Sequence, residues 1–197
     1  QIMDRRVGRN LSTEEASQLC EELNKKIKLD SVPARFQFKN TLEYRGVLVI
    51  RGVKNKLSGY VTNSDPAYTK HGLLGVAKET GTFENIVEYC MPVQDCPDMD
   101  AAYRSALLVN EFTLKSCEVL DRSEVNKKRI KKGFLPANLV LLRDAGDHLP
   151  KLPAIKDKFK KNFGCFVEMP TEEGIALLTG MKIVSLPPPT KNLQKDY

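Results

Sequence analysis

The sequence predicts a mixed α/β (α+β) fold, with an antiparallel element in its first half and a βαβ-like element in its second half, flanked by helices. Three observations carry this prediction. Two long segments repeat apolar residues at helical spacing. Two β-branched segments near residue 40 lie on either side of a turn, which suits an antiparallel pair. The last third of the chain reads as strand, helix and strand, which favours local parallel pairing. We expect these strands to form one mixed sheet.

The first helix should begin after Ser12, because Ser12 and Glu15 match a capping box. Its apolar face then follows at helical spacing in Ala16, Leu19, Cys20, Leu23 and Ile27. Residues 35–38 alternate polar and apolar side chains, and residues 44–51 are rich in β-branched side chains. These two segments predict paired strands, and residues 57–61 suit a further short strand.

The middle of the chain predicts a loop, a long helix and a strand. Residues 62–82 are rich in Gly, Asn, Asp, Ser and Pro, which is typical of a long loop. Residues 98–120 predict a helix that is apolar almost all round and therefore buried. A short helix over residues 124–132 should end at Gly133. The apolar run in residues 138–143 predicts a buried strand.

The C-terminal part should hold a short basic helix or turn, a strand, a helix and a strand, at residues 156–161, 165–168, 172–178 and 182–186. We expect Thr171 to cap the helix and Gly180 to close it. Residues 187–197 predict a Pro-rich end or linker. The length of 197 residues is compatible with one domain or with two small ones, and we expect a single domain over residues 1–197.

Charge is uneven along the chain, whose net charge is +6. Residues 127–161 contain eleven Lys and Arg and three Asp, hence a local charge of +8. Such a region favours an anionic partner, but the charge alone does not choose among a phosphorylated metabolite, a nucleic acid and a membrane surface. No stretch approaches the roughly 18 consecutive apolar residues that span a bilayer, so we expect no membrane partner.

The five cysteines are Cys20, Cys90, Cys96, Cys117 and Cys165. Their odd number and wide spread favour reduced thiols in a cytoplasmic protein. A bridge between Cys90 and Cys96 is the alternative, whereas the spacing of this pair matches no common zinc pattern. The two histidines, His71 and His148, lie in predicted loops, and we expect them to be solvated.

Several short segments follow one another in a distinctive order. They are Asp4-Arg5-Arg6-Val7-Gly8-Arg9, Tyr44-Arg45-Gly46-Val47-Leu48-Val49, Asn63-Ser64-Asp65-Pro66, Val109-Asn110-Glu111-Phe112, residues 126–146, Thr179-Gly180-Met181 and residues 187–190. In order and spacing, the chain resembles the archaeal-type cofactor-independent (2,3-bisphosphoglycerate-independent) phosphoglycerate mutases of the alkaline phosphatase superfamily. It departs from that pattern at Tyr44, where the family has His, and at Asp144 and Pro188, where it has Gly.

The resemblance implies an isomerase that interconverts 3-phosphoglycerate and 2-phosphoglycerate in glycolysis and gluconeogenesis through a phosphoserine. In that family a substrate-binding domain is inserted into a metal-binding, phosphatase-like domain of the same chain. This chain resembles the inserted domain alone. We therefore expect no catalytic residue and no metal within it, and two divalent metals (Mn, Zn or Mg) in the full-length enzyme. The implied partners are a small phosphorylated substrate and the phosphatase-like domain, and the implied location is the cytoplasm.

The same resemblance implies the substrate-binding residues. Arginine binds carboxylate or phosphate through two parallel hydrogen bonds, which suits a lid over a small, highly anionic molecule. The candidate anion clamps are Arg5, Arg6, Arg9, Arg45, Arg129 and Arg143. Asp65 is expected to hold the glycerate hydroxyls or to orient an arginine, with Asn126 and Asn138 as supporting residues. We expect these arginines to converge on one concave face, and both termini to lie on the same side.

Plainer roles stay open for several of these residues. Arg45 and Arg143 also suit the surface of a strand. Arg5 and Arg6 also suit ion pairs with neighbouring acids such as Glu14 and Glu15. Asp65 is a common turn residue before proline, and an asparagine such as Asn138 often satisfies backbone groups in a turn.

Two alternative functions also stay open. One is a stand-alone basic module that binds nucleic acid through residues 127–161. The low aromatic content of 7% and the absence of Trp disfavour the stacking platforms that such a module uses. The other is a divergent member of the family that acts on another phosphorylated metabolite. We favour the mutase over both and expect no nucleic-acid partner.

Overall fold

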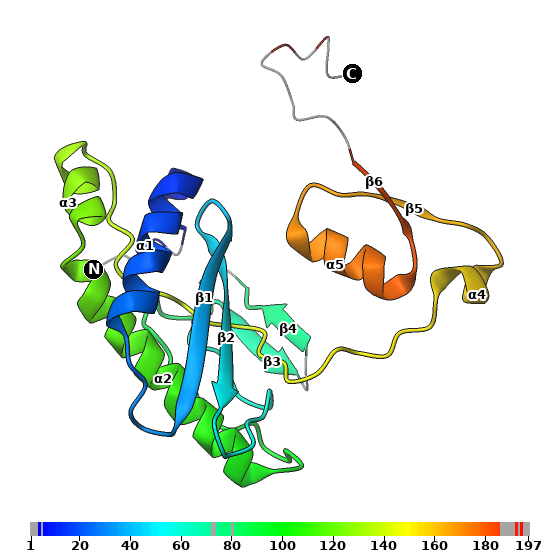
Figure 1. Cartoon of the computed structure of the whole chain (residues 1–197), viewed down its shortest axis with the longest axis horizontal. Helices are drawn as coiled ribbons and strands as arrows, with labels where there is room; N and C mark the ends of the chain where they lie inside the picture. Colours follow the sequence, from blue (N-terminus) through cyan, green and yellow to red (C-terminus); the bar gives the residue numbers. More distant parts are fainter. Residues whose placement is uncertain are drawn as a thin grey trace. The chain divides into compact units, whose positions relative to one another are not determined.

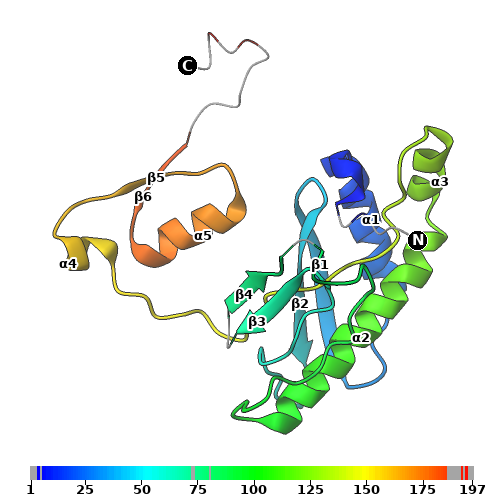
Figure 2. The same ribbon diagram turned by 180° about the vertical axis from the view of Figure 1, so that it is seen from behind.

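A computed structural model describes residues 4, 6–71, 74–79, 81–185, 192 and 194. The chain forms two compact units, Gln1–His148 and Leu149–Tyr197 (Figures 1 and 2). The predicted mixed α/β class is confirmed. The described strands, however, form three separate two-stranded sheets, so the expectation of one mixed sheet is wrong in this part of the chain. Assignment of the whole chain to one substrate-binding domain stays a prediction.

The first unit opens with helix α1 (Thr13–Lys26), whose start follows the predicted capping box. The Ser12 hydroxyl accepts a hydrogen bond from the Glu15 amide at 3.1 Å, and the Glu15 carboxylate accepts one from the Ser12 amide at 3.2 Å. The predicted apolar face is buried, and α1 packs against both β1 and α2 (Figure 1). The local sequence therefore specifies both the start of this helix and the face that it buries.

Strands β1 (Ala34–Leu42) and β2 (Arg45–Gly52) form the predicted antiparallel pair. The rings of Phe36 and Phe38 on β1 contact the ring of Phe112 from α2, with centroids 5.2 and 5.8 Å apart. This aromatic group belongs to the main hydrophobic cluster of the unit, together with the buried face of α1. The hairpin is thus held to both long helices by apolar burial.

Helix α2 (Met99–Asp121) begins at Asp98, whose carboxylate accepts the Ala101 amide at 3.0 Å. Leu108 is fully buried, but Leu114 is 64% exposed, so burial on all sides was a wrong expectation. Helix α3 (Glu124–Lys131) follows and ends before Gly133, which has a φ of +76°. None of the helices in the described ranges has the length and apolar character needed to cross a membrane.

One loop prediction and two strand predictions are wrong in the first unit. The predicted loop at residues 62–82 contains an antiparallel hairpin of β3 (Tyr68–His71) and β4 (Leu74–Ala77). Residues 57–61 contribute only one isolated bridge, between Val61 and Pro92. Residues 138–143 pair with no described strand, because side chains satisfy their backbone instead: the hydroxyls of Ser116 and Ser64 accept the amides of Val140 and Leu142.

The second unit contains α4 (Ile155–Phe159), β5 (Gly164–Phe166), α5 (Pro170–Thr179) and β6 (Lys182–Val184). Strands β5 and β6 pair in parallel around α5, which confirms the βαβ-like element. Gly180 closes α5 at a φ of +69° as predicted, but the N-cap is Met169 and not Thr171. The Glu172 carboxylate accepts the Glu168 and Met169 amides there, so the start of α5 needs no threonine cap. Apart from residues 192 and 194, the predicted end 187–197 lies outside the described residues.

All five cysteines are free, so the alternative of a bridge between Cys90 and Cys96 is wrong. Cys90 is fully buried, and its thiol donates to the Thr62 carbonyl at 3.0 Å. Burial raises the pKa of both the Cys90 and the Cys20 thiol to about 11. These two side chains therefore stay protonated near neutral pH and act as small apolar groups in the core.

A carboxylate on α2 ties that helix to the turn after α1. Glu111 accepts the amide of Asp30 at 2.7 Å and the hydroxyl of Ser31 at 2.6 Å, and it pairs with Lys115 at 2.7 Å. Burial alone would raise the pKa of this carboxyl, but the hydrogen bonds from Lys115, Ser31 and Asp30 outweigh it and lower the pKa to about 2. The ionised form is thus bound more strongly than the neutral form.

This arrangement predicts loss of stability in acid. The pKa of Glu111 is below its ordinary value of 4.5, so its stabilisation is complete above that value and is lost as the pH falls toward 2. We expect Glu111→Gln to lower the free energy of unfolding by up to about 3 kcal/mol at neutral pH, and by much less near pH 3. Urea unfolding across this pH range measures the difference. Glu118→Gln, an exposed position on α2, is the control, and a pH-independent Glu111→Gln effect would contradict the prediction.

Candidate functional site

The N-terminal motif folds into a strained turn. The Asp4 carboxylate accepts the amides of Arg6 at 2.8 Å and Gly8 at 3.1 Å. Three consecutive residues, Val7–Arg9, have φ values of 52°, 63° and 54°, a left-handed conformation that costs about 1–2 kcal/mol per non-glycine residue. Such strain is typical of functional segments when the surroundings hold it. Arg6 is half-buried and Arg9 is exposed, while Arg5 lies outside the described residues.

Arg129 on α3 lies buried beside the N-terminal motif and bonds to the residues that follow it. Its side chain has no exposed surface. The Nε atom donates to the Leu135 carbonyl at 2.9 Å, and the terminal nitrogens donate to Asn10 and to the Glu15 carboxylate. The guanidinium therefore joins α3 to the residue that follows the N-terminal motif and to the first turn of α1.

Asn126, one turn earlier on α3, is a second buried anchor. Its amide group donates to the carbonyls of Leu120 and Ala137, at 2.7 and 2.9 Å, and accepts the Ala137 amide at 2.8 Å. It thereby holds the end of α2 against the start of the extended segment at residues 137–143. Asn138, which follows Ala137, is exposed. Its supporting role stays a prediction.

Two motifs that are about 80 residues apart in the chain meet in the first unit: the 63–66 loop and the 142–147 segment. Ser64 exchanges two hydrogen bonds of 2.8 Å with Leu142, one through its amide and one through its hydroxyl. The Asn63 side chain accepts the Asp144 amide at 3.2 Å. Asp65 is buried, and its carboxylate accepts the Ala67 amide at 3.0 Å, which is the bonding of a turn residue.

Lys70, Gly59 and Asp147 complete this junction, and sequence reasoning missed all three. The Lys70 ammonium donates to the carbonyls of Gly59 and Ala145, at 2.6 and 2.8 Å, and burial lowers its pKa. The Asp147 carboxylate accepts the Gly59 amide at 2.8 Å. Hydrogen bonds from Gly59 and His148 hold the pKa of this carboxyl below its usual range. The His148 ring, expected to be solvated, is 61% exposed but contacts Asp147.

Arg143 projects from this junction. Its guanidinium lies over the Tyr68 ring at 3.9 Å from the centroid, and its Nε atom is 3.4 Å from the Asp144 carboxylate. The side chain is 44% exposed, so the cation is held on a fixed backbone yet accessible to a ligand. Arg45 at the start of β2 is similarly exposed, with its guanidinium 4.7 Å from the centroid of the Tyr44 ring.

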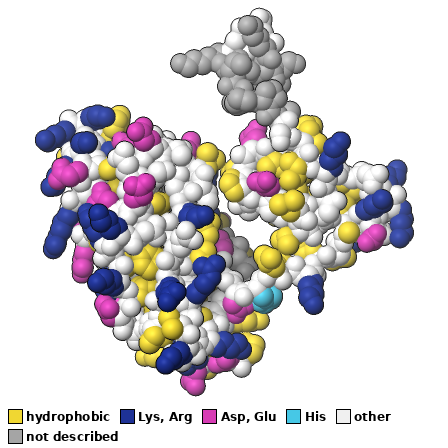
Figure 3. Space-filling model, in the orientation of Figure 1, with side chains coloured by type: hydrophobic (Ala, Val, Ile, Leu, Met, Phe, Trp, Pro, Cys, Tyr) yellow, Lys and Arg dark blue, Asp and Glu magenta, His cyan; other side chains and the backbone are white. Residues whose placement is uncertain are grey.

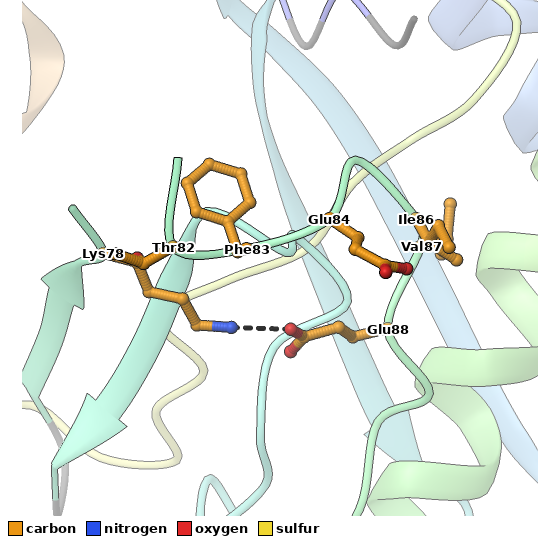
Figure 4. A pocket seen from close by; sticks show the side chains of 7 residues that line it. All are labelled: Lys78, Thr82, Phe83, Glu84, Ile86, Val87 and Glu88. Atoms are coloured by element: carbon orange, nitrogen blue, oxygen red, sulfur yellow. Dashed lines mark hydrogen bonds and ion pairs between the residues drawn. The ribbon is translucent and has the colours of Figure 1, made fainter. Parts of the chain in front are cut away.

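The structure places three of the arginine-bearing segments around one core. Val7, Tyr44 and Leu142 are chain neighbours of Arg6, Arg45 and Arg143, respectively, and all three pack against the main hydrophobic cluster. Convergence of the arginines on one concave face stays a prediction. A hollow of about 380 Å³ lies elsewhere (Figure 4). It is lined by Lys78, Thr82, Phe83, Glu84, Ile86, Val87 and Glu88 and contains none of the candidate arginines.

The described residues form no cluster of metal ligands, and the face drawn in Figure 3 shows no continuous basic stripe. Within the described ranges, no three His, Cys, Asp or Glu side chains gather in a way that could hold a metal ion. On the face of the first unit that Figure 3 shows, Lys and Arg side chains are spread out, with acidic and apolar side chains between them. This face therefore lacks the continuous basic stripe that we expect of a nucleic-acid-binding surface.

Asp144, a departure from the family pattern, occupies a position with a φ of +59°. Glycine adopts this conformation without cost, which explains a glycine there. We expect Asp144→Ala to be less stable than Asp144→Gly by about 1 kcal/mol, because both lack the carboxylate but only alanine keeps a Cβ. Urea unfolding of the two variants side by side measures the difference. Equal stabilities would show that the backbone at this position relaxes.

Comparison with known proteins identifies the family. A family model described as 2,3-bisphosphoglycerate-independent phosphoglycerate mutase matches residues 1–126, which is more than half of the chain. This chain belongs to that family. The mutase of Aeropyrum pernix is 39% identical over 183 residues, and that of Methanopyrus kandleri is 34% identical over 182 residues. These alignments include 91% and 92% of this chain.

The same family relationship holds in three dimensions. A solved cofactor-independent phosphoglycerate mutase from Thermoplasma acidophilum matches with a TM-score of 0.56 and 26% identity, over 94% of this chain and 43% of that one. This chain spans 41% of the length of the Aeropyrum relative and 38% of the length of the Methanopyrus relative. It therefore corresponds to less than half of a full-length family member.

Proposed function

We propose that this chain forms the substrate-binding part of a phosphoglycerate mutase that interconverts 3-phosphoglycerate and 2-phosphoglycerate. The observation that carries the proposal is Arg143, an accessible cation on a backbone held by two motifs of the family. A guanidinium so placed can bind a carboxylate or phosphate group through two hydrogen bonds. The phosphoserine and two divalent metals (Mn, Zn or Mg) belong, in this proposal, to a phosphatase-like domain of the same protein. The five free cysteines fit a cytoplasmic location.

The candidate residues fall into two groups. Arg6, Arg9, Arg45 and Arg143 have exposed or half-buried side chains and are proposed to contact the anionic groups of the substrate. Arg5 joins them by its place in the N-terminal motif. Buried contacts instead support a positioning role for Arg129, Asn126 and Asp65, since each bonds to the backbone beside a motif. Asn138 keeps its proposed supporting role on the strength of the motif alone.

The full-length gene product tests this function. We expect it to convert 3-phosphoglycerate in the presence of manganese and without added bisphosphoglycerate. Arg143→Ala should lower kcat/KM at least tenfold, the equivalent of losing about 1.4 kcal/mol of binding. Arg51→Ala, an exposed arginine on β2, is the matched control and should keep kcat/KM within about twofold of wild type. An active enzyme that tolerates Arg143→Ala would contradict the role of Arg143. An inactive wild type that converts another phosphorylated metabolite would identify a divergent member.

A further inference from the structure

We propose that Tyr68 is a positioning residue that sets the plane and direction of the Arg143 guanidinium. This inference rests on the proposed function and deepens it, because it names a residue that prepares the anion site. Tyr68 belongs to β3, a strand that lies outside the predicted strands and outside the motifs that carry the family resemblance. It does not contact the substrate in this proposal; it acts through Arg143.

The contact between the two side chains is close. The guanidinium carbon of Arg143 lies 3.9 Å from the centroid of the Tyr68 ring, well within the distance at which an aromatic face attracts a cation. Arginine has a long, flexible side chain, and a planar partner restricts the orientation of its planar guanidinium. An arginine that is already oriented loses less conformational freedom when a ligand binds, so affinity for the anion rises.

Both partners of the stack are fixed to the same backbone junction. The Tyr68 carbonyl accepts a hydrogen bond from the Asn63 side chain at 3.2 Å, and Asn63 also accepts the Asp144 amide. Lys70, two residues along β3 and therefore on the same face as Tyr68, donates to the Ala145 carbonyl. Bonds at the two residues that follow Arg143 therefore hold the segment that carries the cation against the strand that carries the ring.

The two edges of the Arg143 guanidinium have different surroundings. Asp144 lies beside Nε at 3.4 Å. The two terminal nitrogens of Arg143 make no hydrogen bond to another residue in the described part of the chain, and this edge can present two parallel donors to a carboxylate or phosphate. The Tyr68 hydroxyl likewise makes no hydrogen bond within the described ranges. The positioning role therefore belongs to the face of the Tyr68 ring, and we expect phenylalanine at this position to perform it equally well.

Kinetics of the full-length enzyme test the role. We expect Tyr68→Leu to raise KM for 3-phosphoglycerate about fivefold with little change in kcat, because a cation–π contact of about 1 kcal/mol is lost from binding. Tyr68→Phe should keep KM at the wild-type value. In an Arg143→Ala background, Tyr68→Leu should change KM less than about twofold, since the partner is already absent. Tyr103→Leu, an exposed tyrosine on α2, is the control. A Tyr68→Leu effect of the same size with and without Arg143, or no effect at all, overturns the inference.

A spectroscopic measurement keeps the inference testable whatever the substrate is. In protein labelled with ¹⁵N-arginine, the Arg143 Nε–H signal, assigned from its loss in Arg143→Ala, should be shifted upfield by the Tyr68 ring. The signal should move toward the position of a free arginine in Tyr68→Leu and stay in place in Tyr68→Phe. An unmoved signal in Tyr68→Leu overturns the inference, even if the mutase activity depends on Arg143. An inactive wild-type enzyme with the expected signal shifts instead overturns the proposed function and leaves the positioning role supported.

Discussion

Gly59→Ala is expected to destabilise the first unit by about 3 kcal/mol, whereas Gly146→Ala should be tolerated. The two glycines face each other across the junction, yet they are not equivalent. A Cβ added to Gly59 would lie 2.7 Å from the Gly146 Cα atom and 2.9 Å from the Asp147 nitrogen. Both are backbone atoms, so no side-chain rotation relieves the clash. A Cβ added to Gly146 meets no atom within 4 Å, and its φ lies outside the left-handed range.

The Gly59 backbone also makes bonds that the clash would break. Its amide donates to Asp147 and its carbonyl accepts from Lys70, so a displacement of this residue disturbs the segment that carries Arg143. Urea unfolding of the two alanine variants and of wild type tests the asymmetry. We expect the Gly146→Ala midpoint to stay near that of wild type. Equal effects of the two substitutions would mean that the close approach of the two backbones relaxes at low cost.

Arg129→Met is the second substitution for which we expect a large effect, a loss of about 3–5 kcal/mol in the free energy of unfolding. The substitution keeps an unbranched apolar chain but removes every hydrogen-bond donor of the guanidinium. The Leu135 carbonyl, the Asn10 side chain and the Glu15 carboxylate would each lose a partner. Removing the buried guanidinium is costly, because the carbonyl, amide and carboxylate groups around it are then no longer compensated. Arg129→Lys should also be destabilising, since an ammonium cannot reproduce the fork of donors.

Lys128→Met provides the control for this prediction. Lys128 is the preceding residue of α3 and is exposed, so its replacement should change stability by less than about 0.5 kcal/mol. Urea unfolding of Arg129→Met and Lys128→Met, measured at the same pH, separates the buried position from the exposed one. An Arg129→Met loss of less than about 1 kcal/mol would contradict the structural role given to this guanidinium.

The two arginines in the 126–146 segment show which features of the candidate site could be predicted from the sequence. Both were predicted as anion clamps, but Arg129 is buried in the unit and Arg143 is exposed at its surface. A signal for the first existed: Arg129 is four residues after Val125, so the two share one face of α3, and that face is buried. No comparable local signal marks Arg143, because its exposure depends on how the 63–66 loop and β3 meet its segment.

Strand prediction failed where backbone pairing depends on distant side chains. The apolar run at residues 138–143 has the composition of a strand, yet Ser64 and Ser116 from elsewhere in the chain satisfy its amides. The β3 and β4 hairpin was missed for the opposite reason, because its short strands lie among turn-forming residues. Side chains from other parts of the chain, which sequence periodicity does not report, decide the first of these cases.

Local sequence is sufficient to specify the elements whose interactions are local. The capping box of α1, the apolar face that α1 buries, the β1 and β2 pair and the glycine at the end of α5 depend on residues a few positions apart. The order of short motifs was likewise enough to indicate the mutase family. The junction that carries Arg143 is different, because the hydrogen bonds between the 142–147 segment and the rest of the junction join residues 75–88 positions apart. Such contacts form only when packing of the whole unit closes the intervening chain, and no local pattern encodes them.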